Sequence, residues 1–163
     1  MKKSRVLFLI ISVFVLVGCS NNELEEKYNT KGYEHISCKR DAEDSNEGTT
    51  VDIHYDVYYK SEYLKILKSE EKITSSNKEV LDNYEKAYKN VYSAYDNLEY
   101  YDNTVTRDND SVKSVTYINY GKVDMDKLMD IEGTEDNVEV TDGKIKIEDW
   151  KSFAKKYGTV CDD

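Results

Sequence analysis

The clearest pattern in the chain is an alternation of apolar and polar residues between Thr49 and Lys60. The alternate positions hold apolar or aromatic side chains: Val51, Ile53, Tyr55, Val57 and Tyr59. A period of two predicts a half-buried β-strand. The short polar link at residues 60–62 predicts a hairpin into a second strand, Tyr63 to Thr74, which alternates less cleanly and ends in charged residues.

A helical pattern follows the predicted hairpin. Apolar and aromatic residues recur at spacings of three and four, which predicts an amphipathic helix of about five turns. The stripe consists of Val80, Leu81, Tyr84, Ala87, Tyr88, Val91, Tyr92 and Tyr95. Ser76 or Asn77 can cap its first turn. We expect the stripe to pack as core rather than to hold a cofactor.

The second half of the chain predicts another strand pair, Leu98 to Arg107 and Val112 to Tyr120, joined by a turn rich in Asp and Asn. A short helix capped by Asp124 and stopped by Gly133 follows. The Asp142-Gly143 pair suits a type I′ turn, so a small hairpin is predicted around it.

The last predicted helix carries four apolar residues on one face, Trp150, Phe153, Ala154 and Tyr157. The pattern contains no internal repeat and no low-complexity linker after residue 33. We therefore predict a single α+β domain over residues 34–163. It would hold an antiparallel sheet of two strand pairs packed against one long amphipathic helix, with a C-terminal hairpin and helix.

The first 18 residues predict an export signal. A positive stretch, Met1 to Arg5, precedes twelve residues, Val6 to Val17, that are apolar except for Ser12. This arrangement is typical of a secretory signal peptide. The alternative, a transmembrane anchor, needs about 20 apolar residues, and the run is too short for one.

The stretch Leu16-Val17-Gly18-Cys19 resembles the lipobox of bacterial lipoproteins. The resemblance implies cleavage before Cys19 and a diacylglyceryl group on its sulfur, so residues 19–33 would form a lipidated tether on the extracytoplasmic face of the cell membrane. Two acyl chains give stable anchoring. A plain signal peptide with a chance cysteine is the alternative.

Loss of the signal peptide makes an acidic chain more acidic. Without Lys2, Lys3 and Arg5 the 23 basic residues fall to 20 against 33 acidic ones, and the net charge moves from −10 to −13. An acidic protein does not have the basic surface that nucleic-acid binding requires. Its own charge does not attract it to anionic lipids either, so the lipid must provide the membrane attachment. The negative charge favours solubility.

Two cysteines remain after Cys19 is assigned to the lipid. Cys38 and Cys161 lie at opposite ends of the predicted domain. In an oxidising compartment such a pair forms a structural disulfide. A reactive thiol pair is the alternative, but the sequence has no C-x-x-C motif.

The order of predicted elements is similar to that of the small YehR-like lipoproteins. The shared part is a strand pair, a tyrosine-rich helix and a second strand pair behind a lipobox. The local phrases are Tyr95-Asp96-Asn97-Leu98-Glu99-Tyr100 and Asn119-Tyr120-Gly121-Lys122-Val123-Asp124. The resemblance supports a fold and a location, and it implies no activity.

Three residues on one side of the first strand, Asp52, His54 and Asp56, form the best candidate metal site. Carboxylates and an imidazole can hold zinc or another divalent ion. The alternative is the solvated face of a half-buried strand. Two Asp-x-Asp pairs, at Asp108 and Asp124, lack the glycine and the alternating ligands of a calcium loop.

No nucleophile elbow and no phosphate-binding glycine loop is present in the sequence. We therefore expect a non-enzymatic binding or interaction domain that needs no cofactor. Its partner would be an envelope protein, a cell-wall polymer or a small ligand. The alternatives are an envelope hydrolase that uses carboxylates or a metal, and a structural accessory lipoprotein. Tyrosine-rich surfaces can serve recognition, but the codon bias of an AT-rich genome explains most of the fifteen tyrosines. Those at apolar positions of the pattern are expected to form core.

Overall fold

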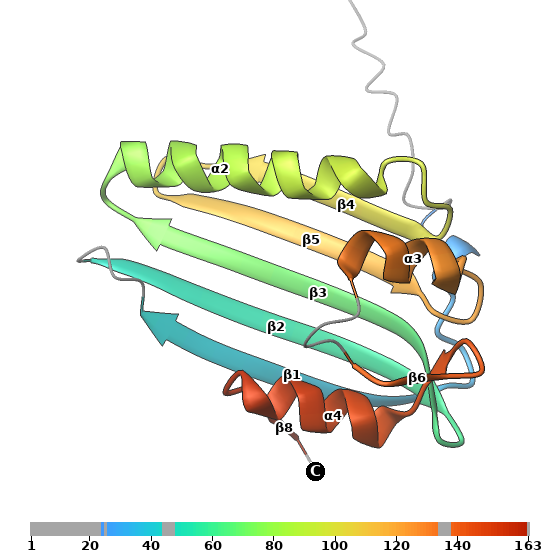
Figure 1. Cartoon of the computed structure of the whole chain (residues 1–163). Coiled ribbons are helices and arrows are strands. Elements are labelled where there is room, and N and C mark those ends of the chain that lie inside the picture. Colours follow the sequence, from blue (N-terminus) through green and yellow to red (C-terminus); the bar gives the residue numbers. More distant parts are fainter. Residues whose placement is uncertain (1–23, 25, 44–47, 134–137, 163) are drawn as a thin grey trace, which may run out of the picture.

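The computed structural model describes residues 24, 26–43, 48–133 and 138–162. Its main feature is a six-stranded sheet in the order β4-β5-β3-β2-β1-β8, in which every neighbouring pair is antiparallel (Figure 1). The strands are β1 (Glu34–Glu43), β2 (Thr49–Lys60), β3 (Tyr63–Ser75), β4 (Tyr101–Arg107), β5 (Ser111–Asn119) and β8 (Val160–Cys161). A separate two-stranded ribbon joins β6 (Val140–Thr141) to β7 (Lys144–Ile145).

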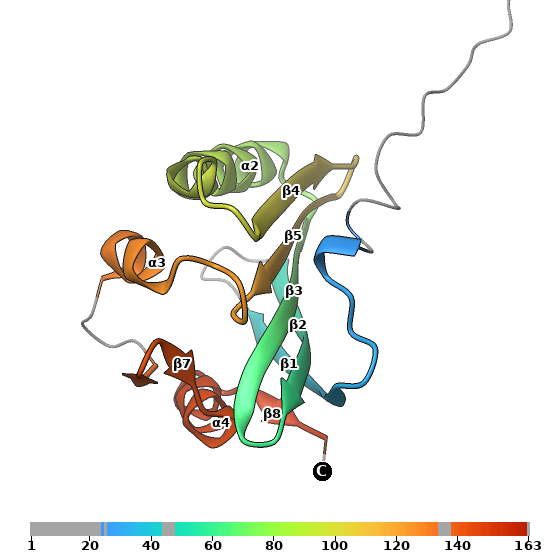
Figure 2. The same cartoon turned by 90° about the vertical axis from the view of Figure 1, so that its right-hand side faces the viewer.

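The helices lie on one side of this sheet (Figure 2). They are α2 (Lys78–Tyr92), its extension η1 (Ser93–Tyr95), α3 (Met125–Glu132) and α4 (Ile147–Lys156). We call this side the helix-covered face. On the other side, the open face, the segment of residues 26–33 runs beside the strands (Figure 2).

Two apolar clusters hold the helices on the sheet. The larger cluster includes Val57, Leu67 and Trp150 and lies beneath α3 and α4. The smaller one contains Ile73, Leu81 and Val112 and lies beneath α2. Each fully buried aliphatic side chain contributes about 1.5–3 kcal/mol by leaving water.

The predicted helix caps are present in the structure. The side chain of Asn77 accepts a hydrogen bond from the Glu79 backbone N–H at 3.0 Å, and that of Asp124 accepts one from Lys127 N–H at 3.2 Å. The bond to the Lys127 backbone lowers the pKa of Asp124. Gly133 ends α3 with φ +77°, a conformation that glycine adopts without strain.

The predicted sheet was incomplete. The two strand pairs belong to one six-stranded sheet, because β1 adds to β2 and β8 adds to β1. β1 was not predicted because the alternation of apolar and polar residues breaks at Arg40. This charged residue occupies an inward position, where the pattern of a half-buried strand needs an apolar side chain. β4 begins at Tyr101 rather than at Leu98, because the chain turns at Tyr100 with φ +67°.

The predicted helix stripe was also too broad. α2 ends at Tyr92 and passes into η1. Val91 is 56% exposed and Ala87 is exposed, whereas Leu81 is completely buried. The tyrosines of α2 therefore lie half-buried along the edge of the core.

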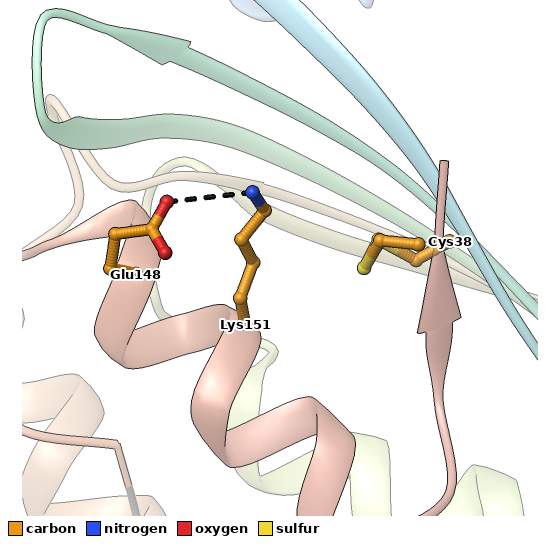
Figure 3. The surroundings of a disulfide bond; sticks show 4 residues. Cys38, Glu148 and Lys151 are labelled. Atoms are coloured by element: carbon orange, nitrogen blue, oxygen red, sulfur yellow. Dashed lines mark hydrogen bonds and ion pairs between the residues drawn. A yellow bond between two sulfur atoms is a disulfide. The ribbon is translucent and has the colours of Figure 1, made fainter. Parts of the chain in front are cut away.

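A disulfide between Cys38 and Cys161 joins β1 to β8, as the cysteine positions predicted. Cys38 is 1% exposed. The bond lies beside α4, where Lys151 pairs with Glu148 at 3.4 Å (Figure 3). It therefore fixes the last strand to the edge of the sheet across 123 residues of sequence.

The segment before β1 packs on the open face, so contacts with the domain begin before the predicted boundary at residue 34. Tyr28 is 6% exposed, and its hydroxyl donates to Asp102 Oδ2 at 2.5 Å. Lys27 pairs with the same carboxylate at 2.6 Å, and Asn119 donates to the Lys27 carbonyl at 3.0 Å. Burial, followed by the bond to Asp102, raises the pKa of Tyr28.

The predicted signal peptide and Cys19 lie outside the described residues. Within the described part of the chain, none of the helices has the length and apolar character that crossing a bilayer requires.

Candidate functional site

A row of polar residues crosses the middle of the helix-covered face. The alternation places apolar side chains inward on both sides of this row, but Ser69 and Glu71 of β3 interrupt it. In the sheet register Ser69 lies between Tyr55 and Thr116, and Glu71 lies between Ile53 and Ser114. We call the row formed by Arg40, Ser69, Glu71, Asn103, Ser114 and Thr116 the polar band.

Asn103 on β4 forms hydrogen bonds with the β5 residues of the polar band. Its side-chain amide donates to Ser114 Oγ at 2.9 Å, to Thr116 Oγ1 at 2.7 Å and to the Val115 carbonyl at 3.3 Å. Both hydroxyl residues are buried. These bonds offset the cost of placing hydroxyls inside the protein.

A cavity of about 290 Å³ lies above the larger apolar cluster and part of the polar band. Its floor comes from the sheet, and its walls come from α2, α3, α4 and the residues around them. The lining includes seven aromatic side chains: Tyr55, Tyr92, Tyr101, Tyr120, Trp150, Phe153 and Tyr157. A concave, mostly apolar site with a few polar groups is the usual form of a small-molecule site.

The aromatic side chains pack against one another around this cavity. Tyr55 meets Trp150 edge to face, with ring centroids 5.6 Å apart. Tyr95 of η1 stacks on Tyr101 at 4.2 Å, and Tyr92 lies 6.3 Å from Tyr95. These contacts fix the rings of η1 and β4 at one end of the cavity.

Among the residues that the structure describes, two charged side chains line the cavity, Arg40 from β1 and Glu132 from α3. Burial, followed by the charge of Glu132, raises the pKa of Tyr95 to about 12. Burial and the neighbouring tyrosines, together with Glu132, also raise the pKa of Tyr101. The hydroxyls of Tyr95 and Tyr101 therefore stay neutral at physiological pH and can both donate and accept hydrogen bonds.

The candidate metal residues lie on the open face. His54 and Asp56 meet, with Nε2 and Oδ1 3.3 Å apart. Asp52 lies further along β2, where it pairs with Asp41 and Lys72 in the sheet register. Among the described residues, no group of three or more His, Cys, Asp and Glu is placed to hold a metal ion.

His35 joins this group, although it lies 19 residues before His54 in the sequence. Its Nε2 lies 3.1 Å from Asp56 Oδ1, and Lys68 Nζ lies 3.4 Å from Oδ2. Burial opposes ionisation of Asp56, but the bond to His35 and the charge of Lys68 hold its pKa below the usual value. Only the register of β1 on β2 brings His35 to this position.

No family model matches the sequence, and no curated protein does. Solved structures with a similar fold include the Escherichia coli YehR protein, determined by NMR, which is 24% identical. The match covers 80% of this chain and 92% of YehR with a TM-score of 0.54. An NMR structure of a protein from Streptococcus pneumoniae is 13% identical, covers 99% of both chains and has a TM-score of 0.51. These similarities establish the fold alone.

Proposed function

We propose that this protein is a lipid-anchored extracytoplasmic binding domain whose cavity on the helix-covered face takes up a small ligand. The cavity is the observation that carries the proposal. Its walls are aromatic and its floor is partly polar, so it can bury the apolar part of a ligand while orienting its polar groups.

The polar band supports a binding role for this face. A polar row inside a sheet weakens the apolar contact between sheet and helices, because each buried polar group has to be paired. Departures from the alternating pattern are expected where function requires them. Arg40 and Ser69 belong to this row and line the cavity, so they can contact a bound molecule.

Two observations support the proposed location. The leader ends in a lipobox-like stretch at Cys19, which predicts a lipid anchor. The Cys38–Cys161 disulfide is typical of proteins that fold in oxidising compartments.

The single tryptophan of the chain, Trp150, lines the cavity and provides a direct readout of binding. We expect members of a small-molecule fragment library to change its emission. Arg40→Ala should weaken hits that carry a polar group. Lys39→Ala, its neighbour on the same strand, should leave them unchanged because Lys39 is exposed. A library without hits, or hits equally weakened by both variants, contradicts the binding role of the cavity.

The proposed anchor is tested separately by mass spectrometry of protein extracted from membranes. The expected species begins at Cys19 and carries the added mass of a diacylglyceryl group. Cys19→Ser should release the protein from the membrane fraction. An intact leader, or a mature terminus without acyl chains, contradicts the anchor and leaves the binding proposal to its own test.

A further inference from the structure

One end of the cavity combines tyrosine rings with a carboxylate. Tyr92, Tyr101, Tyr120 and Glu132 of α3 all line the cavity, and the charge of Glu132 adds to burial in raising the pKa of Tyr101 and Tyr120. They come from the end of α2, the start of β4 and the turn after β5, so the fold rather than a local motif brings them together. η1, which carries Tyr95, packs against α3.

Tyrosine rings beside a carboxylate are suited to binding a positively charged group. The face of an aromatic ring attracts a cation within about 6 Å of its centroid, most strongly where water is excluded. Several rings around one site add to this attraction, as in the aromatic cages that bind quaternary ammonium groups. Glu132 adds a carboxylate that lines the same cavity and is exposed to solvent.

We propose that the tyrosine–Glu132 end of the cavity recognises the ammonium group of a small organic ligand. This inference rests on the proposed binding function and specifies its ligand class. A volume of about 290 Å³ is at the lower limit of ligand pockets, which suits a small molecule rather than a polymer.

The positive charge of Arg40 in the same cavity further specifies the class of ligand. Arg40 lies on β1, whereas Tyr101 lies on β4 and Tyr120 directly follows β5, and β2 and β3 separate β1 from β5 in the sheet. The two charges therefore act on different parts of the cavity. A ligand with an acceptor or anionic group away from its ammonium group can contact both ends, so zwitterions should bind better than simple ammonium ions.

The test compares choline with 3,3-dimethyl-1-butanol, which has the same shape without the charge. Binding to the mature chain is followed by Trp150 emission and by the NMR signals of the tyrosine rings. We expect choline to bind at least about fivefold more tightly than the neutral molecule. Glycine betaine, which adds a carboxylate, should bind more tightly than choline, and Arg40→Ala should remove that advantage.

Two matched pairs of variants locate the ammonium group. Glu132→Gln should weaken choline binding about fivefold or more, whereas Asp130→Asn on the same helix should not change it. Tyr92→Leu should weaken binding, whereas Tyr92→Phe retains the ring face and should preserve it. Circular dichroism of each variant verifies that it has folded.

Three results overturn the ammonium inference. They are equal binding of choline and its neutral counterpart, equal effects of Glu132→Gln and Asp130→Asn, and no response to choline at millimolar concentration. If the neutral molecule binds in the cavity as well as choline does, the proposed binding function still stands and only the ligand class is wrong.

Discussion

The two faces of the sheet use polar residues in different ways. On the open face, Asp56 is surrounded by His35, His54 and Lys68, which pair with its carboxylate at the surface. On the helix-covered face, polar residues occupy inward positions next to a cavity walled by aromatic rings. The Asp56 cluster is therefore explained by pairing at the surface, whereas the polar residues of the helix-covered face lie beside a cavity.

The largest expected effect on stability comes from the disulfide at the edge of the sheet. Replacing both Cys38 and Cys161 by serine should lower the free energy of unfolding by about 4–5 kcal/mol, because the bond closes a loop of more than a hundred residues. Urea denaturation of oxidised wild type and the double variant measures the difference. A loss below about 1 kcal/mol would show that β8 does not depend on the bond.

The next effect compares two positions on α2. Leu81→Ala should cost about 2–5 kcal/mol, since Leu81 is completely buried in the smaller cluster. Val91→Ala should change the free energy of unfolding by less than about 0.5 kcal/mol, because Val91 is 56% exposed. Similar losses at the two positions would contradict the orientation of α2 on the sheet.

A smaller effect concerns the segment that packs on the open face. Tyr28→Phe removes the hydroxyl that donates to Asp102 and should cost about 1–2 kcal/mol. Amide hydrogen exchange of residues 26–30 should accelerate in the same variant. Tyr33→Phe serves as the matched control. Unchanged exchange and stability in Tyr28→Phe would mean that the segment does not stay docked in solution.

The Asp56 cluster predicts a dependence on pH. The pKa of Asp56 is lower in the folded protein than its ordinary value of 3.8. Its contribution is therefore present above that value and is lost as the pH falls through the lowered pKa. Wild type should be more stable than Asp56→Asn near neutral pH, and the difference should shrink below about pH 4. A stability difference between wild type and Asp56→Asn that increases as the pH falls would contradict the lowered pKa of Asp56.

The smallest expected effect on stability belongs to the candidate metal residue His54. Its side chain is 47% exposed, so His54→Ala should change the free energy of unfolding by less than about 0.5 kcal/mol. The proposed site of Asp52, His54 and Asp56 is tested by zinc titration of wild type and this variant. If zinc stabilises the wild type and His54→Ala abolishes this stabilisation, the metal site on the open face is supported.

Much of the fold could be predicted because its signals are local. β2 has the bounds that its alternation predicted, and Asn77, Asp124 and Gly133 mark helix ends through caps that need only neighbouring residues. β1 could not be predicted, because Arg40 interrupts the apolar residues at its inward positions, where it lies opposite Ile53 and lines the cavity.

The candidate site could not be predicted for a related reason. Arg40, Tyr101, Glu132 and Trp150 come from four elements far apart in sequence, and only the sheet order and the helix packing bring them together. The irregular alternation at Ser69 and Glu71 was the one local signal of the polar band. In the sequence this signal is only a strand with an irregular alternation of apolar and polar residues. It does not indicate that a cavity lies above the strand.

The most direct test of the binding role is to map, by amide NMR, where fragment hits perturb the protein. The account predicts shifts that cluster around Tyr55, Ser69, Tyr101 and Glu132, with the amides of His35, His54 and Asp56 unmoved. Shifts confined to the histidine cluster, with a silent cavity, would contradict it and assign binding to the open face.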